Sequence, residues 1–177
     1  MNDSVYVGIL HSLTTIIEEG TDLTLQFESP GHLYDLLKGE YLGHTSEIKA
    51  TAPKRGKPLF YAKLGHRVEE LHIQFPGKTM MGDKEWVEIK ISSSLDESIV
   101  GTHIFRVEIL DPSGKLIEPL SGNHVAGDGH LALLLDVPYN APPGEWTIQA
   151  RDSPPGLEAK RKFFVTSGVR FPQQPAR

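Results

Sequence analysis

The chain has 177 residues, with 18 Lys or Arg against 23 Asp or Glu, so its formal net charge is −5. It has no cysteine, which excludes a disulfide framework, a zinc–thiolate site and a cysteine nucleophile. This mild acidity, without a basic block, argues against nucleic acid and anionic membranes as partners. No stretch is long and apolar enough to span a membrane.

The first third of the chain is rich in segments that predict short strands. Residues 4–10, 13–19 and 22–29 carry many β-branched and aromatic side chains. Residues 13–19 also fit helical spacing, but their threonines and isoleucines favour a strand. A turn is predicted at 29–31, where Pro and Gly follow Ser. A polar loop then precedes another strand at 59–64.

The remainder alternates more clearly between apolar and polar residues. A strand is predicted at 85–92 and a hairpin at 103–117, because alternate side chains in each are apolar. Further strands are predicted within 127–137, after the Pro-Gly turn in 142–152, and at 160–166. The sequence DPSG at 111–114 has the residue preferences of a type I turn. Gly and Pro together number 30, from 17 and 13, which also indicates many turns.

These patterns predict an all-β fold of two tandem antiparallel β-sandwich domains, the second immunoglobulin-like. We expect a small sandwich at 1–66, the immunoglobulin-like sandwich at 67–167 and a flexible tail at 168–177. So small a first domain is expected to pack against its neighbour or against an upstream domain, because it buries only a modest fraction of its own surface.

The segment from Tyr34 to Leu64 resembles the C-terminal β-sandwich of a group of bacterial glycoside-hydrolase-like proteins. That region often follows a β-galactosidase-type trimerisation domain of the glutamine-amidotransferase type. The pattern "YD…G.YLG.T" and its later apolar strand are matched at Tyr34, Asp35, Gly39, Tyr41, Leu42, Gly43, Thr45, Leu59, Phe60 and Ala62. The resemblance implies a β-sandwich accessory region.

The second half is similar to the immunoglobulin-like or macroglobulin-like sandwich that follows in such proteins. The patterns "V.V.DP.G" and "PPG.W…D" are matched at Val107, Asp111, Pro112, Gly114, Pro143, Gly144, Trp146 and Asp152. In that family the catalytic groups lie in an upstream barrel, so the resemblance transfers no catalytic residue to this chain.

One loop offers metal-ligating side chains. His124, Asp128 and His130 lie close together in HVAGDGH and are the only candidates that we single out for a metal. The alternative is a glycine-rich loop with exposed polar side chains. We favour it, because a metal site must satisfy several ligand types and distances together, and we expect no cofactor.

Patterns for catalysis are missing from the sequence. It contains no G-x-S-x-G, P-loop or dinucleotide motif. The acid pairs Glu18–Glu19 and Asp96–Glu97 are adjacent in sequence, so on a strand their side chains would point to opposite faces. A stand-alone hydrolase would need a cleft with converging acids or a nucleophile beside its base.

The two tryptophans are predicted to play different parts. Trp146 shares a strand face with Ile148 and Ala150, which predicts a core residue. Trp86 lies opposite Val87 and its apolar partners, so it is either an exposed platform for carbohydrate or a cover over a seam between domains.

The sequence thus favours a non-catalytic accessory or structural module of a larger bacterial, exported glycoside-hydrolase-like protein. Its partner would be an upstream domain of the same protein or another protein subunit, in an extracellular or periplasmic location. Two alternatives are a carbohydrate-binding module that uses exposed aromatic side chains and a spacer of the macroglobulin or adhesin type.

Overall fold

The computed structural model describes residues 4–10, 18–54, 56–93, 101–152 and 156–168. In these ranges the chain consists of β-strands and one short 3₁₀ turn, η2 (Glu118–Leu120). Nearly all strand pairs are antiparallel, the exception being β6 with β12. The predicted all-β fold class is therefore confirmed. No helix within these ranges is long and apolar enough to cross a membrane.

The first four strands form one sheet in the order β1-β4-β2-β3. Its strands are β1 (Val5–Ile9), β2 (Asp22–Asp35), β3 (Glu40–Thr51) and β4 (Leu59–Leu64). The predicted turn at 29–31 is wrong, because β2 continues through it with a register shift between Gln26 and Gly31. Pro30 has no N–H for the ladder, and Pro and Gly in a strand mark bulges as well as reversals.

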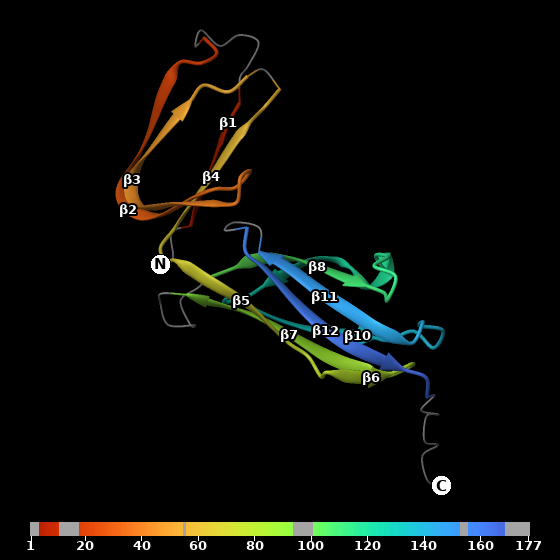
Figure 1. Cartoon of the computed structure of the whole chain (residues 1–177). Helices are drawn as coiled ribbons and strands as arrows, with labels where there is room; N and C mark the ends of the chain where they lie inside the picture. The colour runs from red at the N-terminus through yellow and green to blue at the C-terminus, as the bar shows by residue number, and fades with distance from the viewer. Residues whose placement is uncertain (1–3, 11–17, 55, 94–100, 153–155, 169–177) are drawn as a thin grey trace.

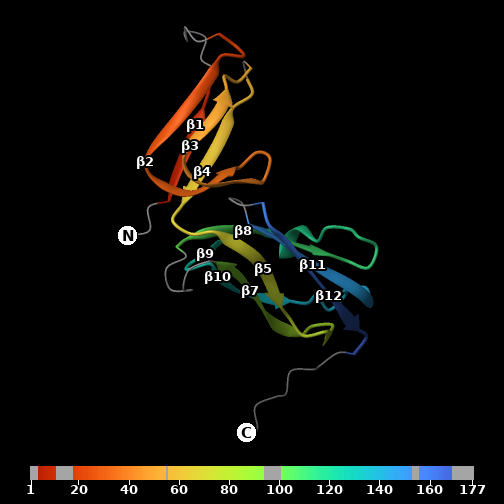
Figure 2. The ribbon, with the colours of Figure 1, turned by 60° about the vertical axis from the view of Figure 1, so that its left-hand side comes forward.

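The irregularity bends the sheet back on itself, as the curving β2 and β3 show in Figures 1 and 2. The bend brings the two halves of the sheet around a small core of its own. Leu33, Ile48 and Tyr61 are buried there, with Ile9, Leu25, Phe27, Ala50 and Leu59 packed against them. We call this part the folded sheet. It is one continuous sheet where the sequence predicts a small sandwich; the predicted domain boundaries stay predictions.

The second part has two facing sheets and is called the sandwich below. One sheet has the order β10-β7-β5 and the other β6-β12-β11-β8-β9. The strands are β5 (Val68–Gln74), β6 (Lys78–Met80), β7 (Lys84–Ser93), β8 (His103–Leu110), β9 (Gly122–Ala126), β10 (His130–Asp136), β11 (Gly144–Asp152) and β12 (Glu158–Thr166). Strands β5, β7 and β10 correspond to A, B and E of an immunoglobulin-type sandwich, and β8, β11 and β12 to C, F and G.

The core of the sandwich comes from the alternating positions that the sequence marks. Val87, Ile89 and Ile91 on β7 are buried, as are the inward residues of β8 and Trp146 on β11. Trp146 is 2% exposed, and its indole Nε1 donates to the Pro142 carbonyl at 2.9 Å. The prediction that Trp146 is a core residue is confirmed.

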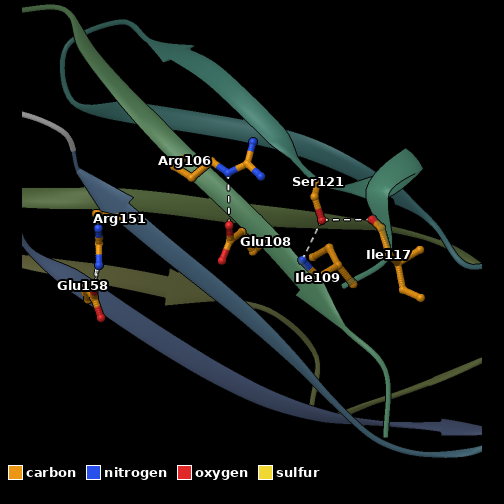
Figure 3. Close-up of polar contacts among 7 residues, drawn as sticks. All are labelled: Arg106, Glu108, Ile109, Ile117, Ser121, Arg151 and Glu158. Atoms are coloured by element: carbon orange, nitrogen blue, oxygen red, sulfur yellow. Dashed lines mark hydrogen bonds and ion pairs between the residues drawn. The ribbon is translucent and has the colours of Figure 1, made fainter. Parts of the chain in front are cut away.

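Polar contacts fix the connections at the ends of the sandwich strands. The Ser121 hydroxyl accepts a hydrogen bond from Ile109 N at 3.0 Å and donates one to the Ile117 carbonyl at 2.9 Å (Figure 3). The DPSG turn closes with Gly114 N donating to the Asp111 carbonyl at 2.9 Å. These contacts satisfy backbone groups that the strands leave unpaired.

Candidate functional site

The folded sheet and the sandwich share one apolar core at their junction. Only Gly65, His66 and Arg67 separate β4 from β5. Tyr34 and Leu64 of the folded sheet belong to the same buried cluster as Val68 and the sandwich core. The Tyr34 hydroxyl accepts a hydrogen bond from Val68 N at 3.1 Å. Burial raises the pKa of Tyr34 above its ordinary value.

The turn between β2 and β3 adds a second contact across the junction. The Asp35 carboxylate accepts hydrogen bonds from Leu37 N at 3.1 Å and Lys38 N at 3.0 Å, which holds the turn in shape. Gly39, at the end of this turn, lies against Gly156 of the sandwich. A Cβ at Gly156 would stand 2.8 Å from the Gly39 Cα, so the two backbones approach as closely as only glycine allows.

Three ionisable side chains are buried where the two parts meet. His103 Nδ1 and Asp152 Oδ2 lie 2.8 Å apart, with the two side chains 2% and 0% exposed. The His66 ring lies 5.7 Å from the His103 ring, between centroids, and His66 is 1% exposed. Neither nitrogen of His66 has a hydrogen-bond partner in the described protein. Burial, and then the neighbouring His103 and His32, lower the pKa of His66 to about 4.

This cluster continues towards the surface through the folded sheet. His32 and His44 are cross-strand neighbours on β2 and β3, with ring centroids 4.7 Å apart. His32 Nδ1 lies 2.8 Å from the Tyr41 hydroxyl, and the Arg67 guanidinium lies 5.1 Å from the Tyr41 ring centroid. Burial, His44 and Arg67 all lower the pKa of His32. Four of the eight histidines therefore gather at the junction.

A groove of about 930 Å³ opens beside the junction. The exposed side chains of Tyr6, Leu37, Phe60 and Ile104 give it an apolar wall. Arg151 and Glu158 stand at its rim, where Arg151 Nε donates to Glu158 Oε1 at 2.8 Å between β11 and β12 (Figure 3). The groove combines apolar surface from both parts with a paired charge from the sandwich.

A second hollow, of about 500 Å³, lies around Trp86, between the three-stranded sheet and Arg161 of β12. Trp86 is 60% exposed and lies opposite Leu134 of β10. Around it stand Gln74, Glu88 and Arg161, and Arg161 Nη2 donates to the Phe75 carbonyl at 3.1 Å. Of the two positions predicted for Trp86, the structure thus has the exposed one, in a hollow that also contains polar side chains.

The loop that carries the metal candidates is a tight connection between β9 and β10. His124 pairs with Phe105 of β8, His130 pairs with Lys90 of β7, and Asp128 occupies the turn with φ of 49°. Across the described ranges, no group of three or more His, Cys, Asp or Glu side chains is placed to hold a metal ion.

Glu18–Glu19, the acid pair that falls within the described residues, takes no part in the junction. Glu19 pairs with Lys54 at 3.2 Å at the far end of the folded sheet. Asp96 and Glu97 lie outside the described residues, as does most of the 13–19 segment.

Sequence reasoning missed the buried group at the junction. His103 is two residues before Phe105, and Asp152 is two residues after Ala150, so strand alternation puts both on the inward face. An ionisable residue at an inward strand position is a signal that the sequence does contain. His66 has no such signal, because it lies in a connection without periodicity.

Comparisons with known proteins assign no family. No family model matches the chain, and no curated protein matches it. Among solved structures, the chain is similar to a superoxide reductase (neelaredoxin) from Ignicoccus hospitalis, with TM-score 0.42 and 11% identity over 56% of this chain and 82% of that one. It is also similar to a β-glucosidase from Listeria innocua, with TM-score 0.40 and 15% identity over 62% of this chain and 17% of that one.

A third similar structure is the CARDB domain of the PF1109 protein from Pyrococcus furiosus. Its TM-score is 0.38 and its identity 14%, over 57% of this chain and 89% of that one. The chain thus spans most of two of these structures and a small part of the β-glucosidase.

Proposed function

We propose that this chain is a non-catalytic accessory module of a larger protein, in which the folded sheet and the sandwich form one rigid unit. The observation that supports the proposal is the apolar core that runs through the junction at Tyr34, Leu64 and Val68. Separate domains are usually joined by polar linkers that few contacts cross. A three-residue connection whose middle residue, His66, is buried instead suits a part that fixes the orientation of its neighbours.

The parent that we propose is a bacterial, exported glycoside-hydrolase-like protein. This part of the proposal rests on the sequence resemblance at Tyr34, Asp35 and Gly39. All three residues lie at the junction, where Tyr34 bonds Val68, Asp35 holds the turn and Gly39 contacts Gly156. Three residues of the resemblance pattern are therefore among those that join the two parts.

The test of rigidity uses the absence of cysteine in the native sequence. Cysteines at the exposed positions Thr24 and Glu118, one on each part, carry spin labels for pulsed EPR distance measurement. We expect a single narrow distance distribution at neutral pH. A broad distribution in the native background would contradict the proposal, as would hydrolysis of glycosides by the purified chain.

Two glycine variants show whether the junction is responsible for that rigidity. Gly156→Ala should broaden the distance distribution, because the new Cβ would meet the Gly39 backbone. Gly114→Ala is the matched control, since Gly114 also has positive φ, 80° against 68°, but has nothing within 4 Å of an added Cβ. Equal broadening in both variants would show that the glycine contact does not hold the junction.

A second candidate function is carbohydrate binding at Trp86. The specific observation in its favour is the 60% exposure of Trp86 in a hollow that also contains Gln74, Glu88 and Arg161. A sugar ring presents an apolar face to an aromatic side chain and hydroxyl groups to amide, carboxylate and guanidinium groups. This hollow offers each of those contacts on one side of the sandwich.

We expect Trp86→Ala to raise the dissociation constant for the bound polysaccharide about tenfold, which corresponds to ~1.4 kcal/mol of binding free energy. Affinity electrophoresis on a panel of polysaccharides measures this change. Phe164→Ala is the control, because Phe164 is similarly exposed at 52% but lies on the opposite sheet. Absence of binding by the unmodified chain to every polysaccharide would remove this candidate, and an equal loss in both variants would place binding elsewhere.

A further inference from the structure

His66 occupies the connection on which the junction depends. It lies between β4 and β5, is 1% exposed and has neither ring nitrogen bonded in the described protein. A neutral imidazole tolerates such a site at moderate cost, whereas an imidazolium without a partner or solvent does not. The protonation state of this residue therefore affects whether the junction stays closed.

The groups that face His66 cannot stabilise its charge in the closed arrangement. From the sandwich it faces His103, whose Nδ1 already contacts Asp152 Oδ2 at 2.8 Å. From the folded sheet it faces His32, which has His44 and the positively charged Arg67 near it. The hydroxyls of Tyr6 and Tyr34 also interact with Asp152, and burial raises the pKa of both further above the ordinary tyrosine value, so they are neutral in mild acid.

We propose that this junction is an acid-sensitive joint: proton uptake by His66 releases the folded sheet from the sandwich while each part keeps its own core. The inference rests on the rigid joint proposed above. The sandwich retains its core around Trp146 and Phe105, and the folded sheet retains the separate cluster of Leu33, Ile48 and Tyr61. The junction is the place where the two parts come apart.

The pH window follows from the direction of the shift. The pKa of His66 in the closed state is lowered from 6.5 to about 4, so the closed state binds the proton less readily than the open state. The contribution of neutral His66 to the stability of the closed junction is fully present above the ordinary histidine pKa. It is lost as the pH falls from about 6.5 to about 4. Over that range the ratio of open to closed molecules should rise by up to roughly 300-fold.

The experiment follows the Thr24–Glu118 spin-label distance at about pH 7.5 and about pH 4.5. Fluorescence of the buried Trp146, recorded in a Trp86→Phe background, reports on the sandwich core. We expect the narrow distribution to widen in acid while the Trp146 emission stays native. His66→Phe should remain narrow at both pH values. His72→Phe, the matched control on the exposed part of β5, should respond as the native chain does.

Each other outcome overturns the inference. If the spin-label distance distribution does not change in acid, the junction is not acid-sensitive, although the module can still be rigid. If His66→Phe responds to acid as the native chain does, groups other than His66 cause the change. Loss of native Trp146 emission together with the distance change means ordinary acid unfolding. If His66→Phe fails to fold, an NMR titration measures the pKa of His66 in the native chain instead. A pKa near the ordinary 6.5 in the closed molecule would contradict the proposal. A broad spin-label distance distribution already at neutral pH would contradict the proposal that the two parts form a rigid module.

Discussion

Replacement of Trp146 by alanine should lower the free energy of unfolding by about 3–5 kcal/mol, the range for a buried aromatic residue. Trp146 is 2% exposed and packs beside Phe163, with ring centroids 6.3 Å apart. The variant would leave a cavity between the two sheets and would also deprive the Pro142 carbonyl of the indole donor. Urea denaturation followed by circular dichroism measures the change.

The matched variant is Trp86→Ala, which removes the same side chain from an exposed position. We expect a change within about 0.5 kcal/mol, because Trp86 is 60% exposed and its loss opens no cavity. Comparison of the two Trp→Ala variants thus separates the effect of burial on stability from the effect of removing a tryptophan. Similar losses in both variants would mean that the two sides of the sandwich strands have been assigned wrongly.

The sandwich could be predicted because its strands repeat a local rule. Phe105, Val107 and Ile109 alternate with polar residues in the sequence, and all three are buried. The same rule puts Trp146 inside, and Trp86, one residue before the buried Val87, outside. Short-range alternation is therefore enough to assign faces wherever one side of a sheet is buried.

The folded sheet shows where such local rules stop. A Pro-Gly pair permits a reversal or a bulge, and no neighbouring residue distinguishes them. The choice between a reversal and a bulge is made by the pairing of β2 with β3 on both sides of the interruption. This pairing joins residues that are distant in sequence, such as Leu25 and Ile48. The sequence pattern therefore marks the irregularity and leaves its geometry open.

The candidate site was predictable only in part for the same reason. The exposure of Trp86 follows from one strand, but the junction needs Tyr34, His66, His103 and Asp152 to meet from four separate segments. No spacing in the sequence relates these residues. The sequence singles out His124, Asp128 and His130 only as metal candidates less favoured than a polar loop, whereas the histidines that gather are His32, His44, His66 and His103.

The buried pair of His103 and Asp152 should also have a large effect on stability. Asp152→Ala removes the carboxylate that contacts His103 Nδ1 at 2.8 Å and leaves that ring nitrogen buried without it. Breaking a buried pair by removal of one partner costs about 3–5 kcal/mol, because the remaining group cannot be hydrated. Urea denaturation at neutral pH should show a loss of this size.

A double-mutant cycle distinguishes this pair from ordinary packing. His103→Leu and the double variant His103→Leu/Asp152→Ala complete the cycle, and the double variant should be more stable than the two single losses added together predict. The interaction free energy should be at least ~1 kcal/mol, since the residues touch. Strict additivity would show that the 2.8 Å contact contributes nothing to the junction. The effect of removing Asp152 would then come from its other contacts and from the space that it fills, and the burial of His103 beside it would need a different explanation.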